Sequence, residues 1–213
     1  MPPPLINIKM FPIAISLYLP WAYSLISYVD YIRNRKEYIK NPHLPKAFDQ
    51  LIQNMFIWLP LSIYILLTNY PTSMAIKTWY TELIMLTFEF AFGEIWFYTL
   101  HRLCHHKWFY FLHKKHHEVI HPIGMLANYA SPFEVTFVNS GSFYLTHIIF
   151  NHSQFHFVAV ITIALFNTIL YSHTPKIKEQ HWIHHRTHKF NFGHSLFMDY
   201  LFGTQQKPVK PNK

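Results

Sequence analysis

The segment WYTELIMLTFEFAFGEIWFYTLHRLCHHKWFYFLHKKHH, residues 79–117, joins the two features that determine the fold of this chain. Its first part, Trp79–Leu100, is predominantly apolar. It is close to the about 20 residues that a helix needs to cross the hydrocarbon core of a bilayer. Its second part holds six histidines within 17 residues. The segment therefore predicts a membrane helix that leads directly into a histidine-rich region.

Four more stretches share this length and apolar composition: Phe11–Tyr28, Phe48–Asn69, Phe133–Phe150 and Phe155–Ser172. Apolar residues make up 51% of the 213 residues and charged residues only 13%, roughly half the share in an average soluble chain. We therefore expect an all-α fold, a polytopic membrane helix bundle of four or five spans. The first stretch is either a full span or a re-entrant anchor. A soluble helical protein is the alternative, but five such stretches exceed the core of a domain this long.

Basic residues mark one side of the predicted membrane. Five of them lie within residues 33–46, whereas the connection Tyr70–Thr78 carries a single lysine. Cytoplasmic loops carry an excess of Lys and Arg, so residues 33–46 are expected in the cytoplasm. Asn151–Gln154 is expected to be a tight turn between two spans, and counting spans then places His101 and His173 on the cytoplasmic side. The net charge of +8 lies in short clusters beside apolar runs, which argues against binding of nucleic acid.

Histidine is concentrated as strongly as the apolar residues. Of the 17 histidines, 13 lie in residues 101–121 and 173–194. Side chains three and four positions apart share one face of a helix, so His101 and His105 point together and His106 turns away. The boxes HKKHH (113–117) and HWIHH (181–185) each repeat the spacing that presents three imidazoles to one region. His173, directly after the last apolar stretch, adds a ninth candidate.

Nine neighbouring imidazoles need a common partner. They would repel one another if protonated, and they are costly to bury without hydrogen bonds if neutral. Metal coordination satisfies their lone pairs, and nine ligands exceed the needs of one ion, so a centre of two metal ions is expected. Imidazole suits zinc, copper, iron and nickel alike, although a structural zinc site usually recruits cysteine and closes with four ligands. A site with so many nitrogen ligands at a membrane surface favours redox-active iron.

Two longer stretches make the chain recognisable. HRLCHHKWFYFLHKKHHEVIHPIGMLANYASPFE (101–134) and HWIHHRTHKFNFGHSLFMDYLFGT (181–204) resemble the sterol desaturase/fatty acid hydroxylase superfamily of membrane di-iron oxygenases, and most closely its methylsterol C4-oxidase branch. The resemblance covers about residues 85–205. The chain departs from it at His173-Thr174-Pro175, where the family often has HSG, and in the short connection from His173 to His181. These departures affect the sterol assignment more than the di-iron assignment.

The resemblance implies O2-dependent hydroxylation of C–H bonds in a sterol or related lipid. It implies two Fe ions and electrons from NAD(P)H, delivered by a separate donor such as cytochrome b5 or a reductase. It divides the chain into N-terminal transmembrane segments (1–80), a fatty acid hydroxylase-type catalytic domain (81–205) and a basic tail (206–213). The histidine boxes would face the cytoplasm, in the endoplasmic reticulum of a eukaryote or the inner membrane of a bacterium. The implied ligands are His101, His105, His113, His116, His117, His173, His181, His184 and His185.

Carboxylates near the boxes are candidates to orient the ligands through a hydrogen bond to the ring nitrogen that does not bind the metal. Glu94 lies on the same helical stripe as His101, and Glu118, Glu134 and Asp199 lie inside the matched stretches. Glu89 lies off that stripe and receives no role. Four histidines beside the boxes lack the spacing of ligands, and four more are treated as background. The first four are His106, His121, His188 and His194, and the others are His43, His147, His152 and His156.

Three other functions remain open at this stage. A desaturase would use the same ligands but remove two hydrogens in place of adding oxygen. A hydroxylase of fatty acyl or alkyl lipids is the main alternative in substrate. A non-catalytic membrane metal-binding protein belongs to a different class, and it would need no electron donor.

Overall fold

The computed structural model describes residues 11–68, 78–150, 152–174 and 180–206, and every regular element in these ranges is helical. Most of the connection Tyr70–Thr78, part of the expected turn at 151–154, residues 175–179 of the short connection and nearly all of the basic tail lie outside the described residues.

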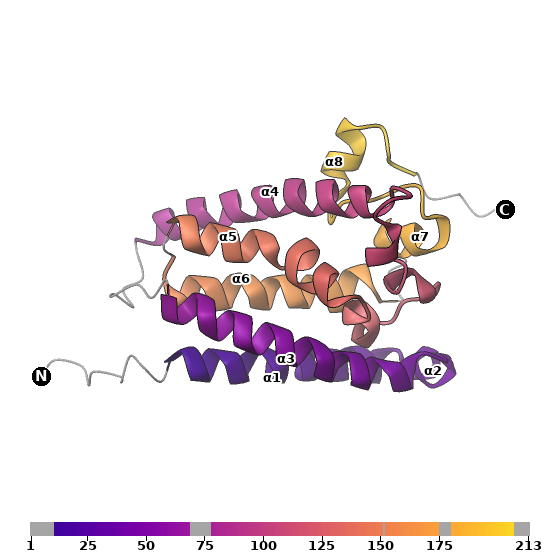
Figure 1. Cartoon of the computed structure of the whole chain (residues 1–213), viewed down its shortest axis with the longest axis horizontal. Helices are drawn as coiled ribbons and strands as arrows, with labels where there is room; N and C mark the ends of the chain where they lie inside the picture. Colours follow the sequence, from indigo (N-terminus) through magenta and orange to yellow (C-terminus); the bar gives the residue numbers. More distant parts are fainter. Residues whose placement is uncertain (1–10, 69–77, 151, 175–179, 207–213) are drawn as a thin grey trace, which may run out of the picture.

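The first part of the chain forms an antiparallel pair of helices. Helix α1 covers Phe11–Arg33, the short α2 covers Arg35–Lys40, and α3 returns over Leu44–Thr68. Helices α1 and α3 lie side by side (Figure 1). Their buried faces meet the later helices in one apolar core that includes Leu19, Leu66 and Phe157.

The second part of the chain completes the bundle. Helix α4 covers Trp79–Cys104, α5 covers Gly141–Phe150, and α6 covers Gln154–Asn167 and continues as a π-helical turn, η6, over Thr168–Ser172. Figure 1 shows α5 and α6 between α4 on one side and the α1–α3 pair on the other. The short helices α7 (Gln180–Thr187) and α8 (Leu196–Leu201) lie toward the end of the bundle where α4 finishes (Figure 1).

Among the residues that the structure describes, three helices are long and apolar enough to cross a membrane: Leu44–Thr68, Trp79–Cys104 and Phe155–Ser172. The expected stretch Phe133–Phe150 does not form one uninterrupted α-helix, because a π-helical turn, η5 (Glu134–Asn139), precedes α5. The ten residues of α5 extend only about 15 Å, roughly half the hydrocarbon thickness. The count of four or five spans therefore stays a prediction.

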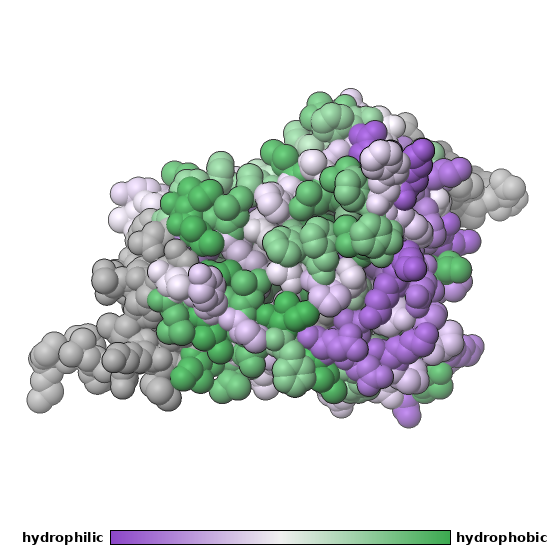
Figure 2. Space-filling model, viewed as in Figure 1, coloured by the Kyte–Doolittle hydropathy of each residue, from purple (hydrophilic) through white to green (hydrophobic). Residues whose placement is uncertain are grey.

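The surface agrees with a membrane setting. Large apolar side chains on the helices are strongly exposed, among them Leu17 (65%), Phe56 (73%) and Ile84 (66%). Soluble monomers seldom expose apolar patches on this scale. Figure 2 shows hydrophobic residues over much of the bundle and hydrophilic residues gathered at the end where α2 and α7 lie. The protein is therefore an integral-membrane helix bundle with one polar end.

A buried carboxylate fastens the N-terminal helices to that polar end. The Asp30 carboxylate accepts hydrogen bonds from Tyr38 Oη (2.7 Å), Gly124 N (2.9 Å), Asn34 Nδ2 (2.7 Å) and Thr174 Oγ1 (3.0 Å). These groups come from three separate parts of the chain, because Asn34 and Tyr38 lie in the same helical turn. Gly124 has to be glycine, because a Cβ there would lie 2.6 Å from an Asp30 oxygen. The sequence carries no signal for this network beyond hydropathy.

We predict that Asp30→Asn lowers thermal stability in detergent. The amide has only one accepting oxygen, so at least one buried donor loses a charge-assisted hydrogen bond worth about 1.5–3 kcal/mol. For a chain of this size that corresponds to a fall in melting temperature of about 2–4 °C per kcal/mol. Differential scanning fluorimetry measures it, with the exposed Asp49→Asn as control. Equal melting temperatures for the two variants would contradict the role of Asp30.

Candidate metal centre

The structure brings all nine predicted ligands together at the polar end of the bundle, in two groups. Within each group, one ring nitrogen of every member lies within 4.8 Å of the others. Eight of the nine side chains are buried, and His105 is partly exposed. The first group consists of His101, His105, His113, His117 and His184, and the second of His116, His173, His181 and His185.

The histidine boxes are divided between the two groups by a simple rule. The pairs four positions apart stay together: 101 with 105, 113 with 117, and 181 with 185. His116 and His184, each three positions after the first histidine of its box, belong to the other group. The three imidazoles of the second and third boxes lie in one region, as expected, but the structure divides them between two groups of donor atoms. The second and third boxes therefore contribute to both groups, whereas both ligands of the first box belong to the first group.

The elements that carry the boxes differ. The first box ends helix α4, and the third occupies helix α7. The second box is not α-helical, since His113 ends one 3-10 turn and His116–Glu118 forms another, η3. His173 follows the π-helical turn η6 directly.

Backbone carbonyl oxygens hold most of these rings from behind. A carbonyl oxygen only accepts, so the facing Nδ1 carries the proton and Nε2 keeps a lone pair. This arrangement turns the lone pairs toward the centre of the site. The pairs are His101 with Phe192 O (2.7 Å), His184 with Phe190 O (2.7 Å), His185 with Val119 O (2.9 Å), His173 with Thr168 O (2.9 Å) and His116 with Tyr129 O (3.3 Å).

The Nε2 atoms of the first group converge on one another. His101 Nε2 lies 3.0 Å from His113 Nε2, and the Nε2 atoms of His105, His117 and His184 lie 3.0–3.1 Å apart. Two such lone pairs in contact repel unless a proton or a cation lies between them. Nitrogens bonded to one metal at about 2.1 Å and at right angles are about 3.0 Å apart, which matches the observed spacing.

The second group also contains ring nitrogens that are free to bind a metal ion. Its members His173 and His185 each have a buried Nε2 with no hydrogen-bond partner among the described residues. Buried polar atoms without partners are rare and costly, and a metal ion would satisfy both nitrogens. The residues of both groups therefore fit metal ions as ligands.

Burial keeps the imidazoles in the neutral form that binds metal. It lowers the pKa of His113 and of His116 to about 3, and it places the pKa of His184 and His185 well below the usual value. Neighbouring histidines lower the pKa of all four further. At neutral pH the rings therefore need no deprotonation before they bind a cation.

Three of the four predicted carboxylates support the ligands. Glu134 Oε1 lies 2.8 Å from His113 Nδ1 and 3.9 Å from His116 Nδ1. Glu118 accepts a hydrogen bond from the Tyr129 hydroxyl (2.7 Å), and the carbonyl of Tyr129 in turn faces His116. Asp199 accepts hydrogen bonds from the backbone N–H groups of residues 192 (2.9 Å) and 193 (2.8 Å), and so fixes the loop whose carbonyls hold His101 and His184.

Glu94 takes a different place from the expected one. Its carboxylate accepts a hydrogen bond from Ser195 N (2.9 Å), and it forms none with a box histidine among the described residues. The helical stripe shared with His101 is real, but Glu94 lies almost two turns earlier, where the loop before α8 crosses α4. The proposal that it orients a ligand is therefore corrected.

The other histidines near the boxes separate into two kinds. His106 and His121 are exposed, as their spacing suggested. His188 and His194 lie close to the centre: the His188 ring is 4.2 Å from that of His117, and His194 stacks on Phe97 at 3.7 Å. Helical spacing could not place them, because α7 ends at Thr187 and His188 adopts a positive φ of 58°.

An apolar cavity of about 580 Å³ opens beside the centre. Its walls come from α1, α3, α4, α5 and α6, with Leu19, Trp58 and Phe143 among them. It reaches members of both histidine groups, including His101 and His173. Its volume falls within the about 300–1,000 Å³ of small-molecule sites.

Apolar membrane helices, paired histidine groups and an adjacent apolar cavity define this chain, by fold and site, as a membrane helix bundle with a candidate two-metal centre. The chain belongs to the fatty acid hydroxylase family, whose model matches residues 86–204.

The sequence is also similar to curated methylsterol monooxygenases. Methylsterol monooxygenase 1 of Gallus gallus is 38% identical over 117 residues, which are 50% of this chain and 38% of that protein. Methylsterol monooxygenase 1 of Danio rerio is 39% identical over 77 residues, 36% of this chain and 26% of that protein. The matches thus span well under half the length of these relatives. No solved structure matches the chain.

We predict that His184→Ala and His185→Ala, one from each group, both lower the bound metal by at least one ion per chain. Each removes a nitrogen from the centre of its group, and the shared boxes link the groups. Inductively coupled plasma mass spectrometry of the purified protein measures this loss. The exposed His106→Ala serves as the control, with metal content equal to wild type. Full metal content in both ligand variants would show that the groups do not bind metal.

Proposed function

We propose that this protein is an O2-dependent lipid hydroxylase that uses two Fe ions, one in each histidine group. The observation that carries the proposal is the convergence of unprotonated imidazole nitrogens directly beside an apolar cavity. Membership of the fatty acid hydroxylase family and similarity to methylsterol monooxygenases support a sterol or related lipid as the substrate.

The two Fe ions would supply the activation of oxygen, and the protein supplies geometry and exclusion of water. The nine histidines would hold the metals, with their rings fixed by backbone carbonyls and by Glu134. Electrons would come from NAD(P)H through a separate protein, such as cytochrome b5 or a reductase.

The apolar walls of the cavity support the proposal of an apolar substrate. A lipid could enter between the membrane helices and place one carbon near His173 and His116, which line the cavity wall at its polar end. The apolar walls would exclude water from the reacting atoms, which prevents loss of the oxidant to solvent.

Membrane topology follows from the same arrangement. We propose four or five spans with the histidine end in the cytoplasm. Helix α2, which carries part of the basic region 33–46, lies at the same end of the bundle as α7 (Figure 1). By the positive-inside rule this end faces the cytoplasm, where electron carriers and NAD(P)H are available. The membrane would be the endoplasmic reticulum or a bacterial inner membrane.

The activity test uses the full-length protein in lipid vesicles with NAD(P)H, a reductase and a methylsterol or a fatty acyl lipid. We expect a product that contains one oxygen atom from labelled O2. His184→Ala should lose at least 100-fold in rate, about 2.7 kcal/mol, whereas His106→Ala should match wild type. Mass spectrometry separates the outcomes, because a desaturase product lacks two hydrogens and gains no oxygen. An unchanged rate in His184→Ala, or no product from either lipid, would contradict the proposal.

A second prediction concerns the cavity. Ala164→Phe adds a ring to the cavity wall and should raise KM for the lipid at least tenfold, about 1.4 kcal/mol of binding. Metal content should stay at the wild-type value. The neighbouring Ile163→Phe faces outward, with 45% exposure, and serves as the matched control. An equal KM in both variants would mean that the substrate binds elsewhere.

A further inference from the structure

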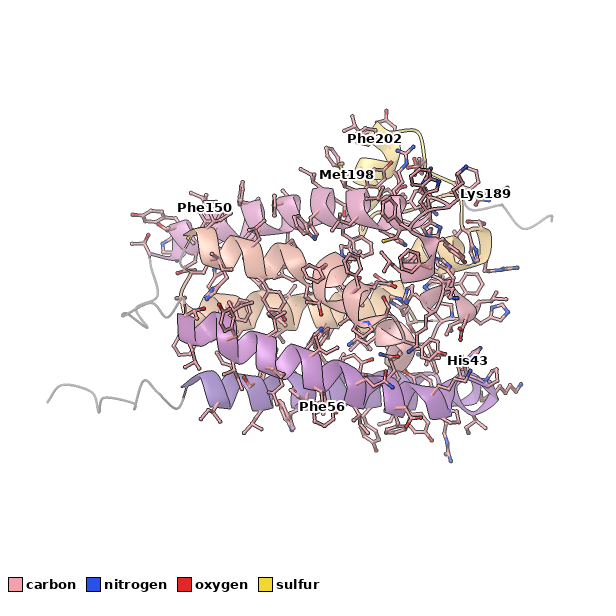
Figure 3. All side chains as sticks on the ribbon, viewed as in Figure 1. His43, Phe56, Phe150, Lys189, Met198 and Phe202 are labelled. Atoms are coloured by element: carbon pink, nitrogen blue, oxygen red, sulfur yellow. The ribbon has the colours of Figure 1, made fainter. Side chains whose placement is uncertain are left out.

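A second cluster of metal-binding residue types lies far from the histidine centre. Glu89 of α4 meets His152 of the α5–α6 turn and His156 of the first turn of α6, and all three are buried. Glu89 precedes His101 by 12 residues, or about 18 Å along helix α4. Figure 3 shows Phe150, whose ring stacks on His152, at the end of the bundle opposite Lys189. The cluster is therefore separate from the candidate metal centre.

One donor atom from each residue of this cluster lies within 4.8 Å of the other two. Glu89 Oε2 lies 2.9 Å from His156 Nε2 and 3.5 Å from His152 Nδ1. Ligands bonded to a tetrahedral zinc ion at about 2.0–2.1 Å are about 3.3 Å apart, so these separations suit a single ion. No described residue forms a hydrogen bond with His152 Nδ1.

The residues around this cluster hold its side chains in the way that hydrogen-bond partners hold metal ligands. Glu82 Oε2 lies 2.7 Å from His156 Nδ1, on the far side of the ring from Glu89. This is a carboxylate–histidine pair of the kind that fixes a metal-bound imidazole. Thr146 Oγ1 donates to Glu89 Oε1 (2.6 Å) and leaves Oε2 for the two rings.

Charge also favours a divalent cation. Glu82 and Glu89 together carry two negative charges, and a carboxylate buried at membrane depth is costly unless it has a partner. A protonated His156 would cancel only one charge and would leave His152 Nδ1 unsatisfied. A divalent ion with neutral imidazoles balances both carboxylates. His147 lies beside the cluster, fully buried, and neither ring nitrogen has a partner among the described residues.

We propose that Glu89, His152 and His156 form a third metal site, which binds Zn²⁺ and joins α4 to the α5–α6 turn. The fourth position is open to water, with His147 nearby as a source of hydrogen bonds. The site stabilises the end of the bundle away from the histidine centre, and it takes no part in oxygen chemistry.

The test measures zinc and iron per chain in full-length protein purified in detergent from zinc-supplemented medium. Wild type should hold one more zinc ion per chain than His152→Gln or His156→Gln, with the same iron content in all three. The exposed Ile149→Ala, near the end of α5, should match wild type. Because the result is a difference between variants, it holds whether or not the histidine centre contains iron.

A second variant, which removes no ligand, tests the site even if the histidine variants fail to fold. Glu82→Gln keeps all three ligands and should weaken zinc binding about 10–100-fold, as expected when a supporting carboxylate is removed. Zinc titration against a competing chelator measures this change. Equal zinc content in wild type and His152→Gln, or unchanged affinity in Glu82→Gln, would overturn the proposal and show that the cluster is an ion-pair network only.

Discussion

The structure depends on the close contact of unprotonated imidazole nitrogens at one end of a membrane helix bundle. Backbone carbonyls accept hydrogen bonds from Nδ1–H groups, as Phe192 O does from His101, and Nε2 lone pairs of the first group face one another at 3.0–3.1 Å. Such an arrangement is stable only with a cation between the rings, and folding of this end and metal binding are therefore coupled. Every element that positions a carbonyl, including the loop held by Asp199, contributes to the same centre.

The bundle provides the surroundings that this centre needs. Exposed apolar side chains suit a lipid environment, whereas polar residues gather at the histidine end (Figure 2). The Asp30 network joins α1 and α2 to Thr174, the residue after His173, so the N-terminal helices also help to position a candidate ligand. The apolar cavity is lined by residues of these helices and by histidines of both groups, so the proposed apolar substrate would reach the polar end without passing through water.

The two metal-binding clusters are built in different ways. The nine box histidines are concentrated in two short windows, and their types and spacing make them visible along the chain. Glu89 is instead separated from His152 and His156 by more than 60 residues, and it meets them only where α4 packs against the α5–α6 turn and the start of α6. Family membership accounts for the first cluster, whereas the second rests on its own geometry, with Glu82 and Thr146 behind the donor atoms.

The sequence by itself determined the helical class, the membrane setting and the nine histidines, because apolar length and i, i+4 spacing are local properties. It also placed His106 outside the site correctly. Only tertiary structure decided how the boxes divide between two groups, since the second box lies in 3-10 turns and the third packs against it from a distant segment. The break in Phe133–Phe150, the role of Asp30 and the loop contact of Glu94 likewise depend on packing between remote segments. Spacing along one helix carries no information about which remote segment packs against it.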